Sequence, residues 1–229
     1  MNLVVKNIDR PDPEVVAGLA RAGVATAHEA AGRIGLLDPG IRPIQQGGVV
    51  AGPAVTVSCA PGDNIMVHAA VEVTRPGDVV VVATTSPSTD GMLGELLATS
   101  FLARGCRAAV IDAGARDVAE LRRMGFLVWS RAVHAQGTVK DTPGSVNLPV
   151  ECGGITVNPG DIVVADDDGV MIVPSLRAGE ILQLAEQRLA KEGEKRARLA
   201  AGELGMDLDG LRTKLEGLGV RWVDSFNEG

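Results

Sequence analysis

Short apolar runs that follow turn residues mark the expected strands of this chain. The runs at 79–83 and 162–165 each follow a Pro-Gly-Asp turn, and their continuous apolar character is typical of strands buried on both faces. A similar run at 108–111 is bounded by Asp112 and Gly114. The expected strands are 49–59, 79–83, 108–111, 127–131, 162–165 and 170–173.

Helix signals alternate with these strands. Asp12, Pro13 and Glu14 combine a cap, a first-turn proline and a first-turn acid, which predicts a helix that stops at Gly23. Residues 26–29 (TAHE) form a capping-box pattern, which predicts the start of a second short helix and gives Glu29 a structural role. Apolar residues at helical spacing predict the remaining helices, over 64–73, about 95–104, 178 to about 201, and around 208–215.

The order of these elements indicates the fold class. Two helices come first, mixed strands and helices follow, and hairpins come late, which predicts one α/β domain that is layered or barrel-like. The long amphipathic helix from 178 follows a complete core, and such a helix commonly packs on another subunit. We therefore expect a core over 1–176 and a C-terminal helical extension over 177–229.

Composition narrows the possible partners. The net charge of −7 leaves no basic surplus for a phosphate backbone, and an aromatic content of 2% without tyrosine argues against base stacking. Small anionic substrates stay possible, because one arginine and a metal can set a local positive field. The three cysteines show no C-x-x-C spacing and are expected to be reduced and buried. Without a signal-peptide layout or an apolar run of about 20 residues, we expect a soluble cytoplasmic protein.

Residues 94–117 (GELLATSFLARGCRAAVIDAGARD) contain the strongest candidate site. Met92, Leu96, Leu97, Phe101 and Leu102 recur at helical spacing, and Gly105 ends this helix. The expected helix is about 15 Å long, and the strand that follows it runs back over about 16 Å. Three charged side chains should therefore meet at one edge of a sheet, together with two helix starts: Glu95, Arg116 and Asp117.

The charged residues expected at that edge can be interpreted in two ways if only their spacing is considered. Helix starts attract anions, and ligands usually bind at this edge of an open α/β sheet. Alternatively, Glu95 and Asp117 are first-turn acids that complement helix dipoles, and Arg116 is a solvated charge. Spacing does not decide between them.

Other polar features give weaker signals. The segment 132–149 is rich in Gly, Thr, Pro, Ser and Asn, and a loop of this length is often a functional lid. His134 in this loop and His68 in a helix have no partner at metal-ligand spacing, so structural roles are expected. The acids at 166–168 lack the spacing of a calcium loop and predict a polar hairpin turn.

The chain resembles the class II pyruvate aldolases known as 4-hydroxy-4-methyl-2-oxoglutarate / 4-carboxy-4-hydroxy-2-oxoadipate aldolases, whose fold is shared with the regulator of ribonuclease activity A. The residues that carry the resemblance are GELLA and the Arg116-Asp117 pair, which follows Glu95 after twenty intervening residues. It extends over nearly the whole chain, through VATAHEAAGR, PGDNIMVHAA, PGDVVVV, VHAQGTVKDTPGSVNLPV and AAGELGMDLDGLR. One departure is Glu95, where family members often carry Asp.

The resemblance implies a fold, a reaction and a cofactor. The fold is a layered β/β/α core of the swivelling-domain type with a C-terminal helical arm. The reaction is cleavage of 4-carboxy-4-hydroxy-2-oxoadipate to pyruvate and oxaloacetate, with activity on 4-hydroxy-4-methyl-2-oxoglutarate and oxaloacetate decarboxylation, in the meta-cleavage catabolism of protocatechuate or gallate. The cofactor is Mg²⁺ or Mn²⁺, held by Asp117 largely through waters.

The resemblance also implies roles for individual residues. Backbone N–H groups of Gly94, Glu95, Leu96 and Leu97 take the substrate carboxylate, and the Glu95 side chain positions metal-bound water or substrate. Arg116 neutralises the enolate oxygen.

Glu29 and Glu192 match family positions at which a neighbouring subunit supplies acids that orient a proton-shuttling water. The family forms trimers, often paired into hexamers. Two alternatives stay open: a non-enzymatic regulator that binds ribonuclease E, and a dedicated oxaloacetate decarboxylase.

Overall fold

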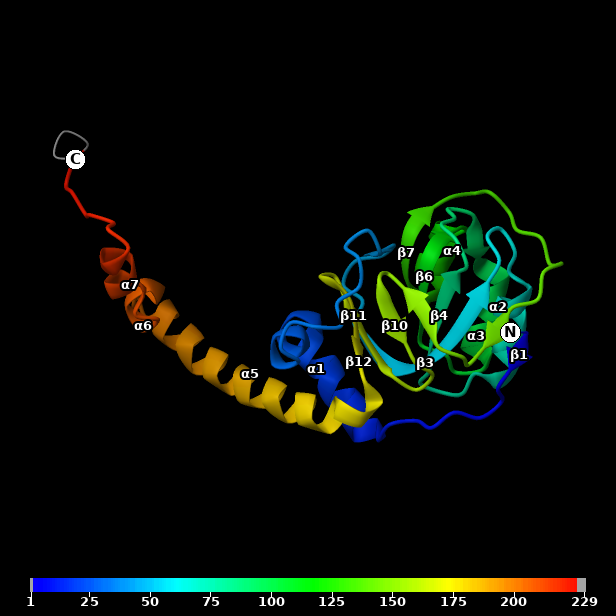
Figure 1. Cartoon of the computed structure of the whole chain (residues 1–229), viewed down its shortest axis with the longest axis horizontal. Coiled ribbons are helices and arrows are strands. Elements are labelled where there is room, and N and C mark those ends of the chain that lie inside the picture. The colour runs from blue at the N-terminus through cyan, green and yellow to red at the C-terminus, as the bar shows by residue number, and fades with distance from the viewer. Residues whose placement is uncertain (1, 226–229) are drawn as a thin grey trace. The chain divides into compact units, whose positions relative to one another are not determined.

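Parallel strands form the centre of the fold in the computed structural model, which describes residues 2–225 (Figure 1). The sheet has the order β1-β8-β3-β4-β6-β7-β2, and β3, β4, β6 and β7 run parallel to one another. The strands are β1 (Leu3–Val4), β2 (Arg42–Pro43), β3 (Val50–Cys59), β4 (Val79–Thr84), β5 (Gly91–Leu93), β6 (Ala108–Ala115), β7 (Leu127–Val133), β8 (Ser145–Val146), β9 (Val150–Cys152), β10 (Ile155–Val157), β11 (Ile162–Asp166) and β12 (Gly169–Val173). The helices are α1 (Pro13–Ala30), α2 (Ile65–Val73), α3 (Glu95–Ala103), α4 (Val118–Met124), α5 (Ala178–Ala200), α6 (Gly205–Leu208) and α7 (Leu211–Gly217), with a 3₁₀ turn η1 (Ser175–Arg177).

The central strands are buried on both faces, as their continuous apolar runs predict. In β4, Val80 and Val82 pack in one core cluster, whereas Val79 and Val81 pack in another on the opposite face. Helices α2, α3 and α4 cover the first face, and strands β9 to β12 cover the second (Figure 1). The mixed α/β architecture and the C-terminal helices are therefore confirmed.

A third cluster joins α1 to the outer side of the β11–β12 hairpin. Leu19 and Ala27 of α1 pack there with Ile162 and Met171, and Ile181 of α5 joins them. The polar turn predicted for residues 166–168 lies at the tip of this hairpin, because Asp166 pairs with Gly169.

The capping box expected at residues 26–29 is wrong. Helix α1 is interrupted only at Gly23, where φ is +74°, and it is helical again from Val24. The Val24 N–H donates to Asp166 Oδ2 at 2.8 Å, so the cap comes from a residue far along the chain. Thr26 consequently lies inside a helical turn, and the Glu29 carboxylate accepts from Arg33 Nε at 3.1 Å.

Two element boundaries also differ from expectation. Met92 belongs to strand β5 and not to the following helix, which begins at Glu95. Strand β6 extends to Ala115, four residues beyond the apolar run, because β5 and β7 continue to pair with it there.

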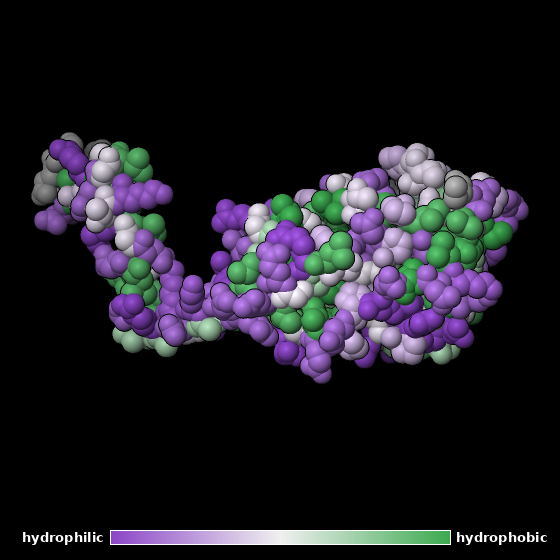
Figure 2. Space-filling model, turned by 60° about the horizontal axis from the view of Figure 1, so that its bottom comes forward, coloured by the Kyte–Doolittle hydropathy of each residue, from purple (hydrophilic) through white to green (hydrophobic). Residues whose placement is uncertain are grey.

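The chain divides into two compact units, 1–186 and 187–229, with the boundary inside α5. The second unit is held by charged pairs between its helices and turns, including Lys195 with Asp209 at 2.6 Å and Arg198 with Glu203 at 2.6 Å. Hydrophilic residues cover most of the face of these helices seen in Figure 2, with small hydrophobic patches between them. Whether this unit packs on a neighbouring subunit stays a prediction.

All three cysteines are buried and unpaired, as expected, and burial raises the pKa of Cys59 and Cys106 to about 12. Between residues 2 and 225, no helix combines the length and the apolar character needed to cross a bilayer.

Candidate active site

The predicted convergence of Glu95, Arg116 and Asp117 is present at the carboxyl ends of β5 and β6. Strand β5 pairs in parallel with β6, and the Arg116 N–H donates to the Leu93 carbonyl at 2.9 Å. This pairing sets the start of α3 beside the start of α4. The Glu95 N–H then donates to Asp117 Oδ2 at 3.1 Å.

Asp117 occupies an unusual backbone conformation. Its φ of 56° and ψ of 35° lie in the left-handed region, which Asp tolerates better than most residues. The residue is the N-cap of α4, and its carbonyl accepts the Leu121 N–H at 3.0 Å. This geometry turns the carboxylate towards α3, and a residue held in such a conformation often belongs to a functional site.

Arg116 lies beside the Asp117 carboxylate, and both side chains are partly open to solvent. The distance from Arg116 Nε to Asp117 Oδ2 is 3.8 Å, and the two side chains are 44% and 43% exposed. An anion and a cation can therefore both reach this pair from solvent. The same exposure keeps the pair's own contribution to stability small.

Gly94 makes room for the Asp117 carboxylate. A Cβ at residue 94 would lie 2.2 Å from Asp117 Oδ2 and 3.1 Å from Arg116 Cγ. No side chain fits there unless the carboxylate moves. Gly94 is therefore required sterically, in addition to the backbone role that the resemblance implies.

The start of α3 offers free N–H groups to an anion. The Gly94 carbonyl accepts the first helical bond, from the Ala98 N–H at 3.1 Å. Within the described part of the chain, the N–H groups of Leu96 and Leu97 have no acceptor. The Glu95 N–H is already used by Asp117, so only part of the predicted carboxylate cradle is open.

The Glu95 side chain folds back along its own helix. Thr99 Oγ1 donates to Glu95 Oε1 at 3.0 Å, one helical turn away. The spacing of four residues puts the two side chains on the same face, so this contact can be read from sequence. Thr99 is thus a site neighbour that sequence reasoning missed.

The segment predicted as a lid lies against Arg116. The His134 N–H donates to the Ala115 carbonyl at 3.0 Å, and the Gln136 carbonyl accepts the Gly91 N–H at 2.8 Å. A Cβ on Gly137 would lie 3.2 Å from an Arg116 guanidinium nitrogen. The loop thereby encloses one side of the guanidinium. No local signal in the sequence assigns Gly137 to this position.

A buried carboxylate anchors the other end of this loop. Asp63 accepts the N–H groups of Ile65, Asp141 and Thr142 at 3.0, 2.7 and 2.6 Å. Burial alone would raise the pKa of Asp63, but these hydrogen bonds lower it below its ordinary value. Asp63 therefore ties the start of α2 to the loop as a charged group.

The histidines have peripheral positions. His68 is exposed on α2, where partial burial and the charge of Lys140 lower its pKa. His134 is exposed on the loop. Neither forms part of a ligand cluster among residues 2–225.

The two acids predicted from a neighbouring subunit are Glu29 and Glu192, and each lies in a different compact unit of the chain. Glu29 is near the end of α1, which packs on the β11–β12 hairpin, whereas α3 and α4 cover the opposite face of the sheet. Glu192 belongs to the second unit and pairs with Arg188 at 2.7 Å. One chain by itself therefore does not bring Glu29 to Arg116.

The donor set suits a hard, mostly hydrated cation. In the described segment, no group of three His, Cys, Asp or Glu side chains is arranged to hold a metal. Asp117 provides an exposed carboxylate with one oxygen bonded to a backbone N–H, and Mg²⁺ is typically held by one or two carboxylates while it keeps several waters. Zinc, which prefers sulfur and imidazole ligands, does not fit these residues.

The fold is that of an RraA-like α/β protein. The chain belongs to the RraA-like family described as Aldolase/RraA, whose profile matches residues 20–172.

Relatives and solved structures agree with this assignment. A Halalkalibacterium halodurans protein named "Putative 4-hydroxy-4-methyl-2-oxoglutarate aldolase" is 32% identical over 66% of this chain and 72% of its own length. A Burkholderia multivorans protein with the same name is 33% identical over 67% of this chain and 94% of its own. The structure of Streptomyces coelicolor RraAS2, described as an unusual member of the RNase ES inhibitor RraA family, has a TM-score of 0.73 at 32% identity over 83% of this chain and 99% of that one.

Proposed function

We propose that this protein is a divalent-metal-dependent pyruvate aldolase that cleaves 4-carboxy-4-hydroxy-2-oxoadipate to pyruvate and oxaloacetate. The same site would cleave 4-hydroxy-4-methyl-2-oxoglutarate to two pyruvates and decarboxylate oxaloacetate, since all three reactions pass through the pyruvate enolate. The observation that carries the proposal is the corner where Arg116, Asp117 and the start of α3 meet. The aldolase names of two relatives support the reaction class.

Asp117 is the residue that would hold the metal, Mg²⁺ or Mn²⁺. Such an ion, when bound, polarises the 2-oxo group of the substrate as a Lewis acid. The carboxylate is pre-positioned by its bond from the Glu95 N–H and by the space that Gly94 leaves. Glu95, held by Thr99, would orient water or substrate beside it.

Substrate binding would use the open helix start. The free N–H groups of Leu96 and Leu97 would donate to the substrate C1 carboxylate, as helix starts do for anions. Arg116 would donate to the oxygen on C2. Because Gly137 lies against the guanidinium, the loop would hold Arg116 in one orientation and keep water from that side.

Bond cleavage would then follow retro-aldol chemistry. A base takes the proton from the C4 hydroxyl, the bond between C3 and C4 breaks, and C4 becomes the ketone of the departing oxo acid. The electron pair remains on C3 as the enolate, whose oxygen gains negative charge beside Arg116. A proton returned to C3 completes the second product, pyruvate.

The base would be a water oriented by Glu29 and Glu192 of a neighbouring subunit. Both residues pair with arginines in this chain, Glu29 with Arg33 and Glu192 with Arg188, and these pairs would hold their side chains in place. A site built in this way requires an oligomer, and we propose the trimer or hexamer typical of the family. The C-terminal helical extension that begins at residue 177 would pack on the neighbouring subunit.

An assay of pyruvate release tests this proposal. The purified chain is given each of the three substrates with Mg²⁺ or Mn²⁺, and pyruvate is measured with lactate dehydrogenase in the presence and absence of a chelator. We expect turnover that the chelator abolishes. Turnover unaffected by the chelator would exclude the metal-dependent mechanism, and relative kcat/KM values would distinguish an aldolase from a dedicated oxaloacetate decarboxylase.

A second candidate is a regulator that binds ribonuclease E. It is favoured by the likeness to a Streptomyces protein described as a member of an RNase inhibitor family. A pull-down with purified ribonuclease E tests it. Binding by a chain that turns over none of the three substrates would favour the regulator.

A further inference from the structure

A cavity of about 390 Å³ lies at the amino ends of the parallel strands. It is bordered by α1, by the start of β3 and by the turn that precedes β4. Strand β4 spans six residues, or about 20 Å, between this edge and the opposite one where Arg116 lies. The cavity is therefore separate from the candidate active site, and its volume is within the range of small-molecule sites.

Apolar side chains form most of the cavity wall. One wall is a stripe of α1 formed by Val16, Ala17 and Ala20. The facing wall contains Val49, which directly precedes β3, and Pro53 within β3, and Pro76 closes one side. The side chains of these residues cannot hydrogen-bond, so an occupant would need an aliphatic body.

Close packing fixes the shape of this cavity. A Cβ on Gly52 would lie 2.3 Å from the Gly77 carbonyl, and a Cβ on Gly105 would lie 2.9 Å from Pro76 Cα. The Gly77 N–H also donates to the Gly105 carbonyl at 2.9 Å. The turn at 76–77 is thus held between β3 and the turn that follows α3. A cavity with such walls is preformed.

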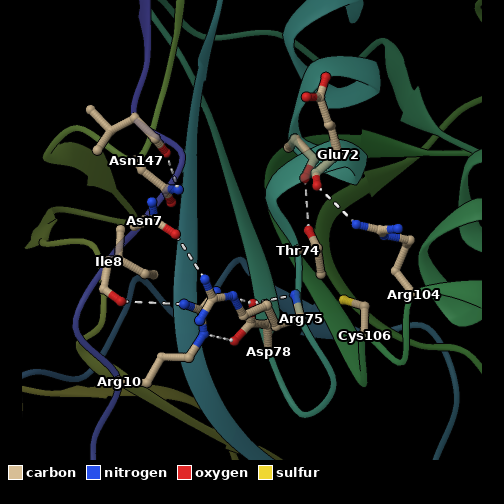
Figure 3. A network of polar contacts seen from close by, with 12 residues as sticks. Asn7, Ile8, Arg10, Glu72, Thr74, Arg75, Asp78, Arg104, Cys106 and Asn147 are labelled. Carbon is tan, nitrogen blue, oxygen red and sulfur yellow. Dashed lines mark hydrogen bonds and ion pairs between the residues drawn. The ribbon is translucent and has the colours of Figure 1, made fainter.

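Two guanidinium groups line the cavity, and only one of them is neutralised. Arg10 donates to both oxygens of Asp78 at 2.8 and 2.7 Å and to the Ile8 carbonyl at 3.3 Å (Figure 3). Asp78 is fully buried, so this pair is a fixed, neutral feature of the wall. Among residues 2–225, Asp78 lies behind Arg10 and no acidic side chain lines the cavity itself.

Arg107 supplies the second guanidinium. Its side chain is exposed, and within residues 2–225 it has no hydrogen-bond or ion-pair partner. The cavity therefore carries one positive charge in excess beside an apolar space.

We propose that this cavity binds a small aliphatic monocarboxylate, with the carboxylate on Arg107 and the aliphatic chain between α1 and β3. A single unpaired guanidinium matches one negative charge in bidentate geometry. A neutral hydrocarbon would leave Arg107 unpaired, and an inorganic anion would leave the apolar walls in contact with water. This binding does not depend on the reaction proposed for the Arg116 corner.

Titration calorimetry with octanoate on the full chain tests this site. We expect saturable binding, and we expect Arg107→Gln to weaken it by about tenfold or more, because a hydrogen-bonded charge pair is lost. Ala17→Phe should abolish binding by filling the cavity. The matched control is Arg21→Gln, which should leave the affinity unchanged. It removes an exposed guanidinium from α1, the helix that carries Ala17, at a position outside the cavity.

Several outcomes would overturn the proposal. These are no saturable binding of octanoate, equal affinity in the Arg107→Gln and wild-type proteins, or an equal loss in Arg21→Gln. Tighter binding of octanol or octyl phosphate than of octanoate would contradict the assignment to a monocarboxylate. Circular dichroism of each variant checks that the fold is intact, which is expected because Ala17, Arg21 and Arg107 are exposed.

Discussion

Replacement of Gly94 by alanine tests the geometry of the proposed active site without removing any charged group. Gly94 has φ of −139° and ψ of −167°, an extended conformation that alanine adopts without strain, so any effect must come from the added methyl. That Cβ would lie 2.2 Å from Asp117 Oδ2. The carboxylate must therefore move by about 1 Å to reach a normal van der Waals separation.

The displacement should affect activity far more than stability. A misplacement of about 1 Å in a catalytic group can cost about 100-fold in rate, and we expect kcat/KM for pyruvate release to fall by about that factor. The free energy of unfolding should fall by less than about 1 kcal/mol, because the separated Asp117 carboxylate and Glu95 N–H can both bond to water. Mn²⁺ affinity, measured by electron paramagnetic resonance, should also weaken.

Gly179→Ala is the matched control. This glycine lies in α5, and a Cβ there would meet no atom within 4 Å. The variant should retain full activity and gain up to about 1 kcal/mol of stability. If Gly94→Ala retains wild-type kcat/KM and Mn²⁺ affinity, the position of Asp117 is not required and the steric reasoning is refuted.

Three further predictions concern other residues. Arg116→Ala should lower kcat for carbon–carbon cleavage by about 100-fold or more while circular dichroism shows an intact fold; near-normal kcat would remove Arg116 from its role. Hydrogen bonds hold the pKa of Asp63 below its ordinary value despite burial, so its charge stabilises the fold above about pH 3.9 and this contribution is lost as the pH falls through the folded-state pKa. The Tm of the wild type should therefore drop more steeply below about pH 4 than that of Asp63→Asn, and parallel curves would contradict this assignment. Because Cys59, Cys106 and Cys152 are buried with raised pKa values, a thiol reagent should label none of them in the native protein and all three after unfolding; native labelling would contradict the burial.

Local patterns in the sequence were sufficient to predict the central helix–strand unit. The helix from Glu95 and the strand from Ala108 both follow from apolar spacing, and their lengths alone predict that Arg116 and Asp117 return to the level of Glu95. The structure adds the exact contact, a bond from the Glu95 N–H to Asp117, which requires the left-handed conformation of Asp117.

Contacts between distant segments could not be predicted in this way. The cap of Val24 comes from Asp166, which is 142 residues away, so the local TAHE pattern gave the wrong helix start. Met92 has an apolar side chain that fits either a helix or a strand, and pairing of β5 with β6 decides for the strand. The approach of Gly137 to Arg116 likewise depends on a loop anchored by the buried Asp63.

The cavity beside Arg107 was also invisible in the sequence. Its lining comes from four separate segments, and each residue has an ordinary local role in a helix, a strand or a turn. Only the arrangement of β3, β4 and α1 brings these apolar surfaces together.

The central claim is that the Arg116–Asp117 corner cleaves a 2-oxo acid with the help of a divalent metal. The most direct measurement is pyruvate release from 4-carboxy-4-hydroxy-2-oxoadipate by the purified chain with Mg²⁺ present, and again after EDTA is added. We expect turnover that stops with EDTA and resumes when excess Mg²⁺ is restored. Absence of turnover with this substrate and with 4-hydroxy-4-methyl-2-oxoglutarate, or turnover indifferent to EDTA, would contradict it.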